Sequence, residues 1–191
     1  MLLVASRMGA EPTAFRVATE ADRPQIEALI SRSAHGLMGG DYTHEQLEAA
    51  RRYVFGVDGE LLADGTYWVC ERSGALVAAG GWSRRRSLFG GDAAVSGRVP
   101  GALLDPSREP ARIRAFFVDP GVARQGLGRA LLELCEREAA RAGFHSLELV
   151  ATLSGVPLYA AAGFEPGERF EVVLPPGVPF PVVRMARPIR R

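Results

Sequence analysis

The apolar positions of the chain follow two rhythms, one typical of helices and one typical of strands. Over residues 126–142 an apolar residue recurs every three to four positions, which places Leu127, Leu131 and Cys135 on one helical face and charged residues on the other. Gly143 then ends this helix as a C′ residue would. Three shorter helices are predicted: after the capping sequence at 19–22, from about residue 43 to residue 54, and over 156–162.

β-rich runs elsewhere predict short strands. They are expected over residues 14–18, 66–71, 76–82, 112–118, 147–151, 170–174 and 182–185. Residues 72–75 and the Pro-rich segment 175–177 suit hairpin turns. Residues 83–110 hold many Gly, Pro and Ser and lack periodicity, so we expect a long loop of the kind that is usually functional or mobile.

The resulting order of elements, β-α-α-β-β-β-α-β-α-β-β, predicts a mixed α/β sheet. Its first half is antiparallel, and one central β-α-β crossover follows. This order fits neither a doubly wound sheet nor a sandwich. The length of 191 residues is that of one domain, which we place at residues 13–191 behind a flexible tail of residues 1–12.

Composition argues against several partners and chemistries. The 23 basic and 22 acidic residues nearly cancel, so the net charge indicates neither nucleic-acid nor membrane binding. The chain has no lysine and no asparagine, which excludes a lysine Schiff base, a P-loop lysine and an N-glycosylation sequon. Cys70 and Cys135 form no CxxC and have no histidine nearby, so neither a disulfide framework nor a metal site is expected.

The sequence shows neither a membrane span nor a signal peptide. No apolar run approaches the length of a membrane span, and the apolar residues 1–5 are too few for the core of a signal peptide. We therefore expect a soluble, cytoplasmic protein.

The most informative stretch is 118–132, where a strand leads through a glycine-containing turn into the longest helix. The first amides of a helix have no intrahelical acceptor, and the helix dipole adds partial positive charge there. Gly126 and Gly128 allow a pyrophosphate to approach the backbone, and Arg124 and Arg129 offer charge-assisted hydrogen bonds. The pattern is that of a phosphate-binding turn, although a purely structural turn would share its glycines.

Two other phosphate motifs fit less well. A Walker A loop fails because Gly-Lys-Ser/Thr is absent. A dinucleotide-binding turn is closer, since Gly126-x-Gly128 is present and Glu148 lies 20 residues beyond Gly128. Its third glycine would fall at Leu131, however, and the hairpin upstream is wrong for that fold. A dinucleotide-dependent oxidoreductase stays open as a third hypothesis.

The stretch resembles the acyl-CoA-binding motif of the GNAT (GCN5-related N-acetyltransferase) superfamily, Arg/Gln-x-x-Gly-x-Gly/Ala after a Val-x-Pro strand end. Val118, Pro120, Gly126 and Gly128 match, whereas the first motif position is Ala123, followed by Arg124. A second segment, Leu-Tyr-Ala-Ala-Ala-Gly-Phe at 158–164, is similar to the family's Leu-Tyr-x-x-x-Gly-Phe at the correct spacing. The resemblance is specific over 112–164 and topological over the rest of 13–191.

The resemblance implies a GNAT-like acyl-CoA N-acyltransferase fold and a set of site residues. In the family the pantetheine arm lies where two parallel strands splay, here those at 112–118 and 147–151, and a backbone N–H near Val118 would stabilise the oxyanion. Tyr159 matches the general acid that protonates the leaving thiolate, a role that suits a phenol with a pKa of about 10. The implied cofactor-binding residues are Phe117, Val118, Ala123, Arg124, Gln125, Gly126, Leu127, Gly128 and Arg129.

The general base and the acceptor pocket are less well defined. Where some members carry a glutamate, this chain has Arg112 and Arg114, which form a candidate cationic wall for an acceptor with a carboxylate; Glu148 or a water chain is left as the base. The segments that shape the acceptor pocket in the family contain His35, Tyr42, His44 and Trp82. The run Arg84-Arg85-Arg86 is either a solvated surface or a contact for a CoA phosphate.

The function that the resemblance implies is transfer of an acetyl group from acetyl-CoA to a primary amine of a small molecule or peptide. The amine attacks directly in a ternary complex, acetyl-CoA is a co-substrate, and no metal takes part. A CoA-binding sensor without turnover is the alternative. Dimers are common in the family, so a homodimer is compatible with the resemblance.

Overall fold

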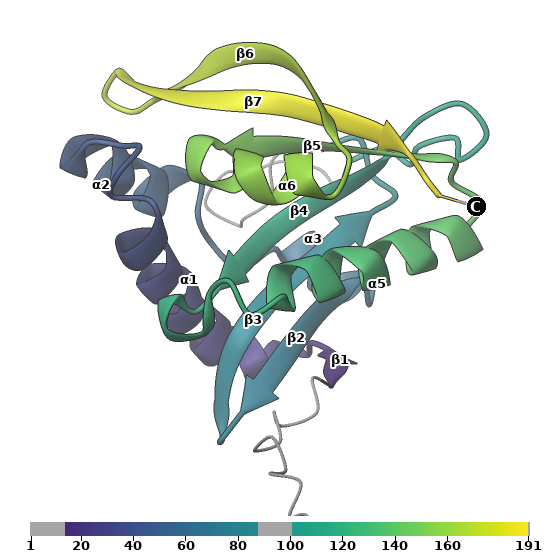
Figure 1. Ribbon diagram of the computed structural model, residues 1–191, viewed down its shortest axis with the longest axis horizontal. Helices are drawn as coiled ribbons and strands as arrows, with labels where there is room; N and C mark the ends of the chain where they lie inside the picture. The colour runs from purple at the N-terminus through teal and green to yellow at the C-terminus, as the bar shows by residue number, and fades with distance from the viewer. Residues whose placement is uncertain (1–13, 88–100, 191) are drawn as a thin grey trace, which may run out of the picture.

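The structure, a computed structural model, describes residues 14–87 and 101–190 (Figure 1). The tail expected at 1–12 and the middle of the expected loop at 83–110 lie outside these ranges. One seven-stranded sheet has the order β1-β2-β3-β4-β5-β7-β6. The strands are β1 Phe15–Val17, β2 Tyr67–Arg72, β3 Ala75–Ser83, β4 Ala111–Val118, β5 Ser146–Thr152, β6 Glu165–Leu174 and β7 Val178–Pro188.

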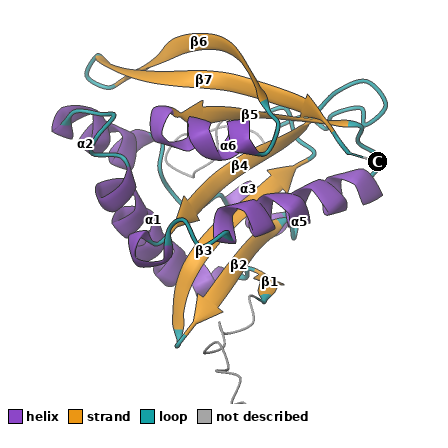
Figure 2. Cartoon of the chain, viewed as in Figure 1, coloured by secondary structure: helices purple, strands orange, loops and turns teal. Residues whose placement is uncertain are grey.

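Only β4 and β5 pair in parallel; the other neighbouring strands are antiparallel (Figure 2). The mixed sheet with one central β-α-β crossover is therefore confirmed. The helices in the described chain are α1 Arg23–Leu37, α2 His44–Tyr53, α3 Gly59–Ala63, α5 Leu127–Arg141 and α6 Val156–Ala161, with 3₁₀ turns η1 Glu20–Asp22, η2 Pro120–Val122 and η3 Leu153–Gly155.

Local sequence signals account for several element boundaries. The Thr43 hydroxyl accepts from the Gln46 amide at 3.2 Å, and the Gln46 side chain accepts from the Thr43 amide at 3.0 Å, which closes a capping box at the start of α2. Ser73 and Gly74 both have positive φ, 51° and 78°, so a tight turn joins β2 to β3. Gly143, at φ 91°, follows α5 as its sequence position predicts.

The structure also differs from the expected elements. The short helix α3 was not predicted, because its five residues are too few to show a helical period. Asp58 caps it: the carboxylate accepts from the Leu61 amide at 3.1 Å. The last hairpin is longer than predicted, since β6 begins at Glu165 and β7 at Val178. The first part of β6 is exposed and contains Pro166, so it lacks the alternation that marks a half-buried strand.

The core is divided between the two faces of the sheet. One cluster of buried apolar residues packs α1, α2 and α3 against the sheet, and a second packs α5 and α6 against it. Figure 1 shows α5 and α6 in front of the sheet and α1 with α2 along its left side. Cys70 and Cys135 are both buried in apolar surroundings, and burial raises the pKa of both thiols.

Candidate active site

The centre of the sheet is open between its two parallel strands. β4 and β5 pair at only two positions, Ala111 with Leu147 and Arg112 with Glu148. Both strands continue beyond this pairing, β4 to Val118 and β5 to Thr152. A wedge-shaped gap therefore lies between them, where the sequence resemblance places it.

A β-bulge in β4 accompanies the gap and was not predicted. Between the pairs Ala79–Phe117 and Gly81–Arg114, β4 has one residue more than β3, and Ala115 has a positive φ of 55°. Gly80 makes room for the bulge, because a Cβ atom there would lie 2.5 Å from the Phe116 ring. Glycines inside a strand are a signal for a bulge, so Gly80 and Gly81 could have indicated it.

A cavity of about 510 Å³ extends from this gap over both faces of the sheet. It brings together nearly all of the proposed site residues: Phe117, Val118, Ala123, Arg124, Gly126, Leu127, Gly128, Arg129 and Tyr159. Gln125 does not line the cavity. Its side-chain oxygen instead accepts from Arg72 Nη1 at 3.1 Å, which ties the loop to the β2–β3 hairpin.

The turn before α5 presents a run of unpaired amides to the cavity. Arg124 and Gly126 have positive φ values of 65° and 85°. Among the described residues, the amides of 124–129 donate to no acceptor, and α5 has no side-chain N-cap. Successive free amides with alternating backbone handedness form an anion-binding concavity, to which the dipole of a 15-residue helix adds.

The two glycines of this turn have different roles. A Cβ atom at Gly126 would meet nothing within 4 Å, so this glycine is explained by its φ and by the open approach to the amides. A Cβ atom at Gly128 would lie 3.2 Å from Leu158, so this glycine lets α5 pack closely against α6.

The end of β4 is held by α1. The Asp119 amide donates to Val77 on β3 at 2.9 Å, so the preceding amide, that of Val118, points away from β3 toward the open side. There it donates to the Ser33 hydroxyl at 3.3 Å. Ser33 also lines the cavity, and nothing in the sequence marked it.

A salt bridge and a close helix contact complete this attachment. Arg32 donates to the Asp119 carboxylate at 2.7 Å and lowers the pKa of that group. Gly36 lies directly on Pro120, where a Cβ atom would come within 2.3 Å of the proline ring. The last half of α1 therefore sets the position of the loop that leads to α5.

Tyr159 projects from α6 into the cavity. Its ring packs at 6.2 Å from Phe116 and at 5.8 Å from Phe164, measured between centroids. Its hydroxyl makes no hydrogen bond to any described residue. Burial raises the pKa of Tyr159 above its ordinary value, so the phenol keeps its proton at neutral pH.

Of the candidate base and the two candidate wall arginines, the structure places only Arg114 in the lining of the cavity. Glu148 forms salt bridges with Arg112 at 2.8 Å and Arg184 at 3.2 Å and does not line the cavity. Arg114 does line it, but its guanidinium is paired with Asp58 at 3.2 Å and Glu60 at 3.1 Å. Neighbouring elements therefore supply a carboxylate to each arginine, and of the two only Arg114 lines the cavity.

None of the four residues expected near the acceptor pocket lines the cavity. His35 and His44 are exposed, and Trp82 is buried against Phe144. Tyr42 is buried, donates to the Pro181 carbonyl and accepts from the Leu153 amide; burial raises its pKa to about 12.

The three consecutive arginines also lie away from the cavity. Arg85 pairs with Asp64 at 2.7 Å, Arg86 pairs with Glu109, and Arg84 lies over the Trp82 ring. None of the three lines the cavity, so the sequence 84–86 forms surface interactions.

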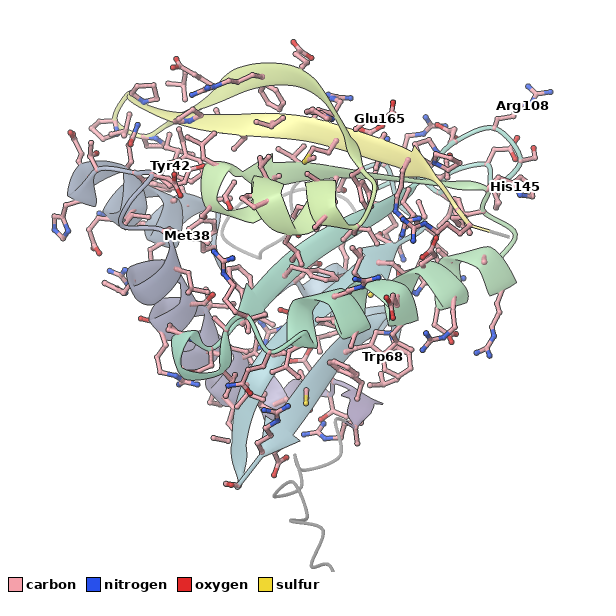
Figure 3. The ribbon with its side chains drawn as sticks, viewed as in Figure 1. Met38, Tyr42, Trp68, Arg108, His145 and Glu165 are labelled. Carbon is pink, nitrogen blue, oxygen red and sulfur yellow. The ribbon has the colours of Figure 1, made fainter. Side chains whose placement is uncertain are left out.

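Apolar side chains from separate parts of the chain line the far half of the cavity. They come from α1, the segment after α2, β6 and β7: Leu37, Met38, Val54, Phe55, Val172 and Phe180. Figure 3 shows Met38 and Tyr42 close together where α1 and α2 approach the β5–α6 end of the sheet. In residues 14–87 and 101–190, no group of three His, Cys, Asp or Glu residues could hold a metal, and no helix could cross a membrane.

Comparison with known proteins identifies the family. The model of the acetyltransferase (GNAT) family matches residues 30–164. The chain belongs to the GNAT acetyltransferase family. A comparison with curated proteins found no match.

Solved structures agree with this GNAT fold. A GCN5-related N-acetyltransferase from Rhodopseudomonas palustris is similar with a TM-score of 0.68 and 18% identity, over 96% of this chain and 99% of that one. An N-acetyltransferase from Thermoplasma acidophilum in complex with coenzyme A has a TM-score of 0.61 and 12% identity, over 93% and 99%. A ribosomal-protein-alanine N-acetyltransferase from Brucella melitensis has a TM-score of 0.57 and 20% identity, over 92% and 99%. At these identities the likeness shows the fold alone.

Proposed function

We propose that the protein is an acetyl-CoA-dependent N-acetyltransferase that acts on a primary amine of a small molecule or peptide. The observation that carries the proposal is the run of unpaired amides at 124–129, which opens into the same cavity as the gap between β4 and β5. These amides, together with Arg124 and Arg129, fit a diphosphate, and the gap fits an extended arm that pairs with strand backbone.

The proposed reaction is a direct transfer in a ternary complex. The nitrogen lone pair of the amine forms a C–N bond with the thioester carbonyl carbon, and the C–S bond then breaks. A backbone amide near Val118 stabilises the charge on the carbonyl oxygen, and Tyr159 gives its proton to the leaving thiolate. The phenol of Tyr159 suits this role because it lines the cavity and is protonated at neutral pH before transfer.

The proton of the amine needs a different route. No Asp, Glu or His among the described residues lines the cavity. We propose that the amine loses its proton to water, either before binding or after attack. Glu148 is not part of the proposal, because Arg112 and Arg184 already pair with it.

Amine-dependent release of free CoA tests the enzyme against the sensor hypothesis. Acetyl-CoA is mixed with the purified protein and a panel of primary amines, and the free thiol is titrated while the acetylated amine is identified by mass. Stoichiometric release of thiol and formation of amide are expected with at least one amine. Tight CoA binding without amine-dependent release would instead favour the sensor.

The dinucleotide hypothesis is tested by ligand-induced stabilisation. A ligand present at 100 times its Kd stabilises the folded state by about 2.7 kcal/mol, which raises Tm measurably. We expect CoA to raise Tm and NAD to leave it unchanged. A shift with NAD alone would contradict the proposed function.

A further inference from the structure

Apolar side chains predominate in the half of the cavity away from α5, where Thr152 and Ser154 add hydroxyl groups. Six of its side chains, Leu37, Met38, Val54, Phe55, Val172 and Phe180, are aliphatic, thioether or aromatic. The rings meet edge to face: Phe55 lies 5.8 Å from Phe117 and 5.9 Å from Phe180, between centroids. We call these six residues, with Phe117, the acceptor half of the cavity.

The charged side chains that line the cavity within the described chain are all arginines, and none of them can pair with a cationic acceptor. The charged residues that line the cavity within the described chain are Arg114, Arg124 and Arg129. Arg124 and Arg129 belong to the turn and first turn of α5, at the opposite end. The Arg114 side chain is 1% exposed and pairs with both Asp58 and Glu60. Among the described residues, no carboxylate side chain therefore lines the acceptor half for an ammonium group to pair with.

An apolar wall without a carboxylate selects against a charged amine. Moving an ammonium ion out of water without a partner is costly, and such a site lowers the pKa of a bound amine. An alkylamine, with a pKa near that of a lysine side chain at about 10.4, is almost entirely protonated at pH 7. An aromatic amine is uncharged at pH 7 and brings a flat apolar ring that suits edge-to-face contacts.

From this lining we infer that the acceptor is an arylamine, an uncharged amine carried on a compact aromatic ring, and not a polyamine or a lysine side chain. The inference rests on the proposed acetyl transfer. The arylamine nitrogen forms the C–N bond, the C–S bond breaks, and the thiolate takes the Tyr159 proton. The excess proton on nitrogen passes to water, and the Tyr159 phenolate regains a proton from water. No protein base is needed, because the nucleophile enters without its extra proton.

A matched set of acceptors tests the inference on the full-length protein. Acetylation of aniline, benzylamine and 1,5-diaminopentane is followed by amide formation between pH 6 and pH 9. We expect kcat/KM for aniline to be independent of pH and at least 100-fold above that of the diamine at pH 7. For benzylamine, kcat/KM should rise about tenfold per pH unit, in step with the uncharged fraction of the amine.

The outcomes separate this inference from the proposed function. Acetylation of the diamine or of a lysine-containing peptide in preference to aniline would overturn the arylamine inference and leave the transferase proposal intact. If the protein binds CoA but acetylates none of the amines tested, both the arylamine inference and the transferase proposal are overturned.

Two neighbouring valines provide a controlled change of the acceptor half. Val172 lines the cavity, whereas Val173, the next residue of β6, is 70% exposed. Val172→Glu should lower kcat/KM for aniline about tenfold or more and raise that for the diamine. Val173→Glu should leave both values within twofold. An unchanged ratio of aniline to diamine in Val172→Glu would contradict the inference.

A second variant covers the case in which Val172→Glu does not fold. Leu37 also lines the cavity but is 38% exposed at the end of α1, so Leu37→Glu places a carboxylate there with little burial. The same shift from aniline toward the diamine is expected, with CoA affinity unchanged. Loss of activity toward both amines in equal proportion would count against the inference.

Discussion

The two halves of the cavity are built in different ways. The cofactor half comes from one continuous stretch, β4 and the turn into α5, and it offers mainly backbone amides at 124–129. The acceptor half comes from segments as far apart in sequence as Leu37 and Phe180, and it offers side chains. A backbone site of this kind is recognisable as a short motif, whereas a side-chain site assembled from distant segments has no local signature.

Substitutions should therefore have different consequences in the two halves. In the cofactor half, what matters is the backbone shape and the space above it, so glycines are the sensitive positions. In the acceptor half, the chemistry of each side chain sets which amine enters. The expected effects below run from the largest to the smallest.

Arg114→Ala should have the largest effect on stability. It leaves Asp58, whose side chain is 3% exposed, buried without its cation, and a broken buried ion pair costs about 3–5 kcal/mol. The measurement is the free energy of unfolding in urea. Arg85→Ala removes a more exposed salt bridge, to Asp64, and should cost clearly less. Equal costs for the two variants would show that burial does not set the strength of the Arg114 cluster.

Tyr159→Phe should lower kcat by about 100-fold or more, because proton transfer from a positioned general acid raises the reaction rate by at least about that factor. The hydroxyl makes no hydrogen bond to a described residue, so stability and CoA affinity should stay close to wild type. Turnover is measured at saturating substrate and affinity by calorimetry. A kcat equal to that of the wild type would remove Tyr159 from the mechanism.

Gly126→Val should weaken CoA binding by about 30-fold, through loss of one or two charge-assisted hydrogen bonds to the amides that the side chain covers. Valine at positive φ also strains the backbone, so a control with the same strain is needed. Gly74→Val provides it, at φ 78° in the β2–β3 turn and away from the cavity. If both variants bind CoA as the wild type does, the amides around Gly126 do not bind the diphosphate.

Ser33→Ala should have the smallest effect. Without its hydroxyl the Val118 amide lacks an acceptor in the free protein, and we expect a loss of about 1 kcal/mol in stability. If a pantetheine carbonyl pairs with that amide, the bound state loses little, so CoA should bind a few-fold more tightly. Ser31→Ala, on the same helix, serves as the control. Weaker CoA binding in Ser33→Ala would show that Ser33 supports the ligand and does not compete with it.

Much of the cofactor half could be predicted because its signals are local. Gly126, the amphipathic pattern of α5 and the Leu-Tyr segment each depend on a few neighbouring residues. The gap between β4 and β5 was implied by the family resemblance that these motifs carry. The partners of Arg112 and Arg114 could not be predicted. Glu148 lies on the next strand and Asp58 at the start of a single-turn helix, and side chains from distant segments pair only after the chain has folded.

The sequence by itself determined the order of the strands and of the longer helices, the family and the position of the amide-lined turn, because periodicity and glycine placement act over a few residues. Tertiary structure alone decided which arginines are neutralised, that Ser33 meets Val118, and that Phe55, Val172 and Phe180 enclose an apolar space. These contacts join residues far apart in the chain, and their energies depend on burial and distance, which no local pattern encodes.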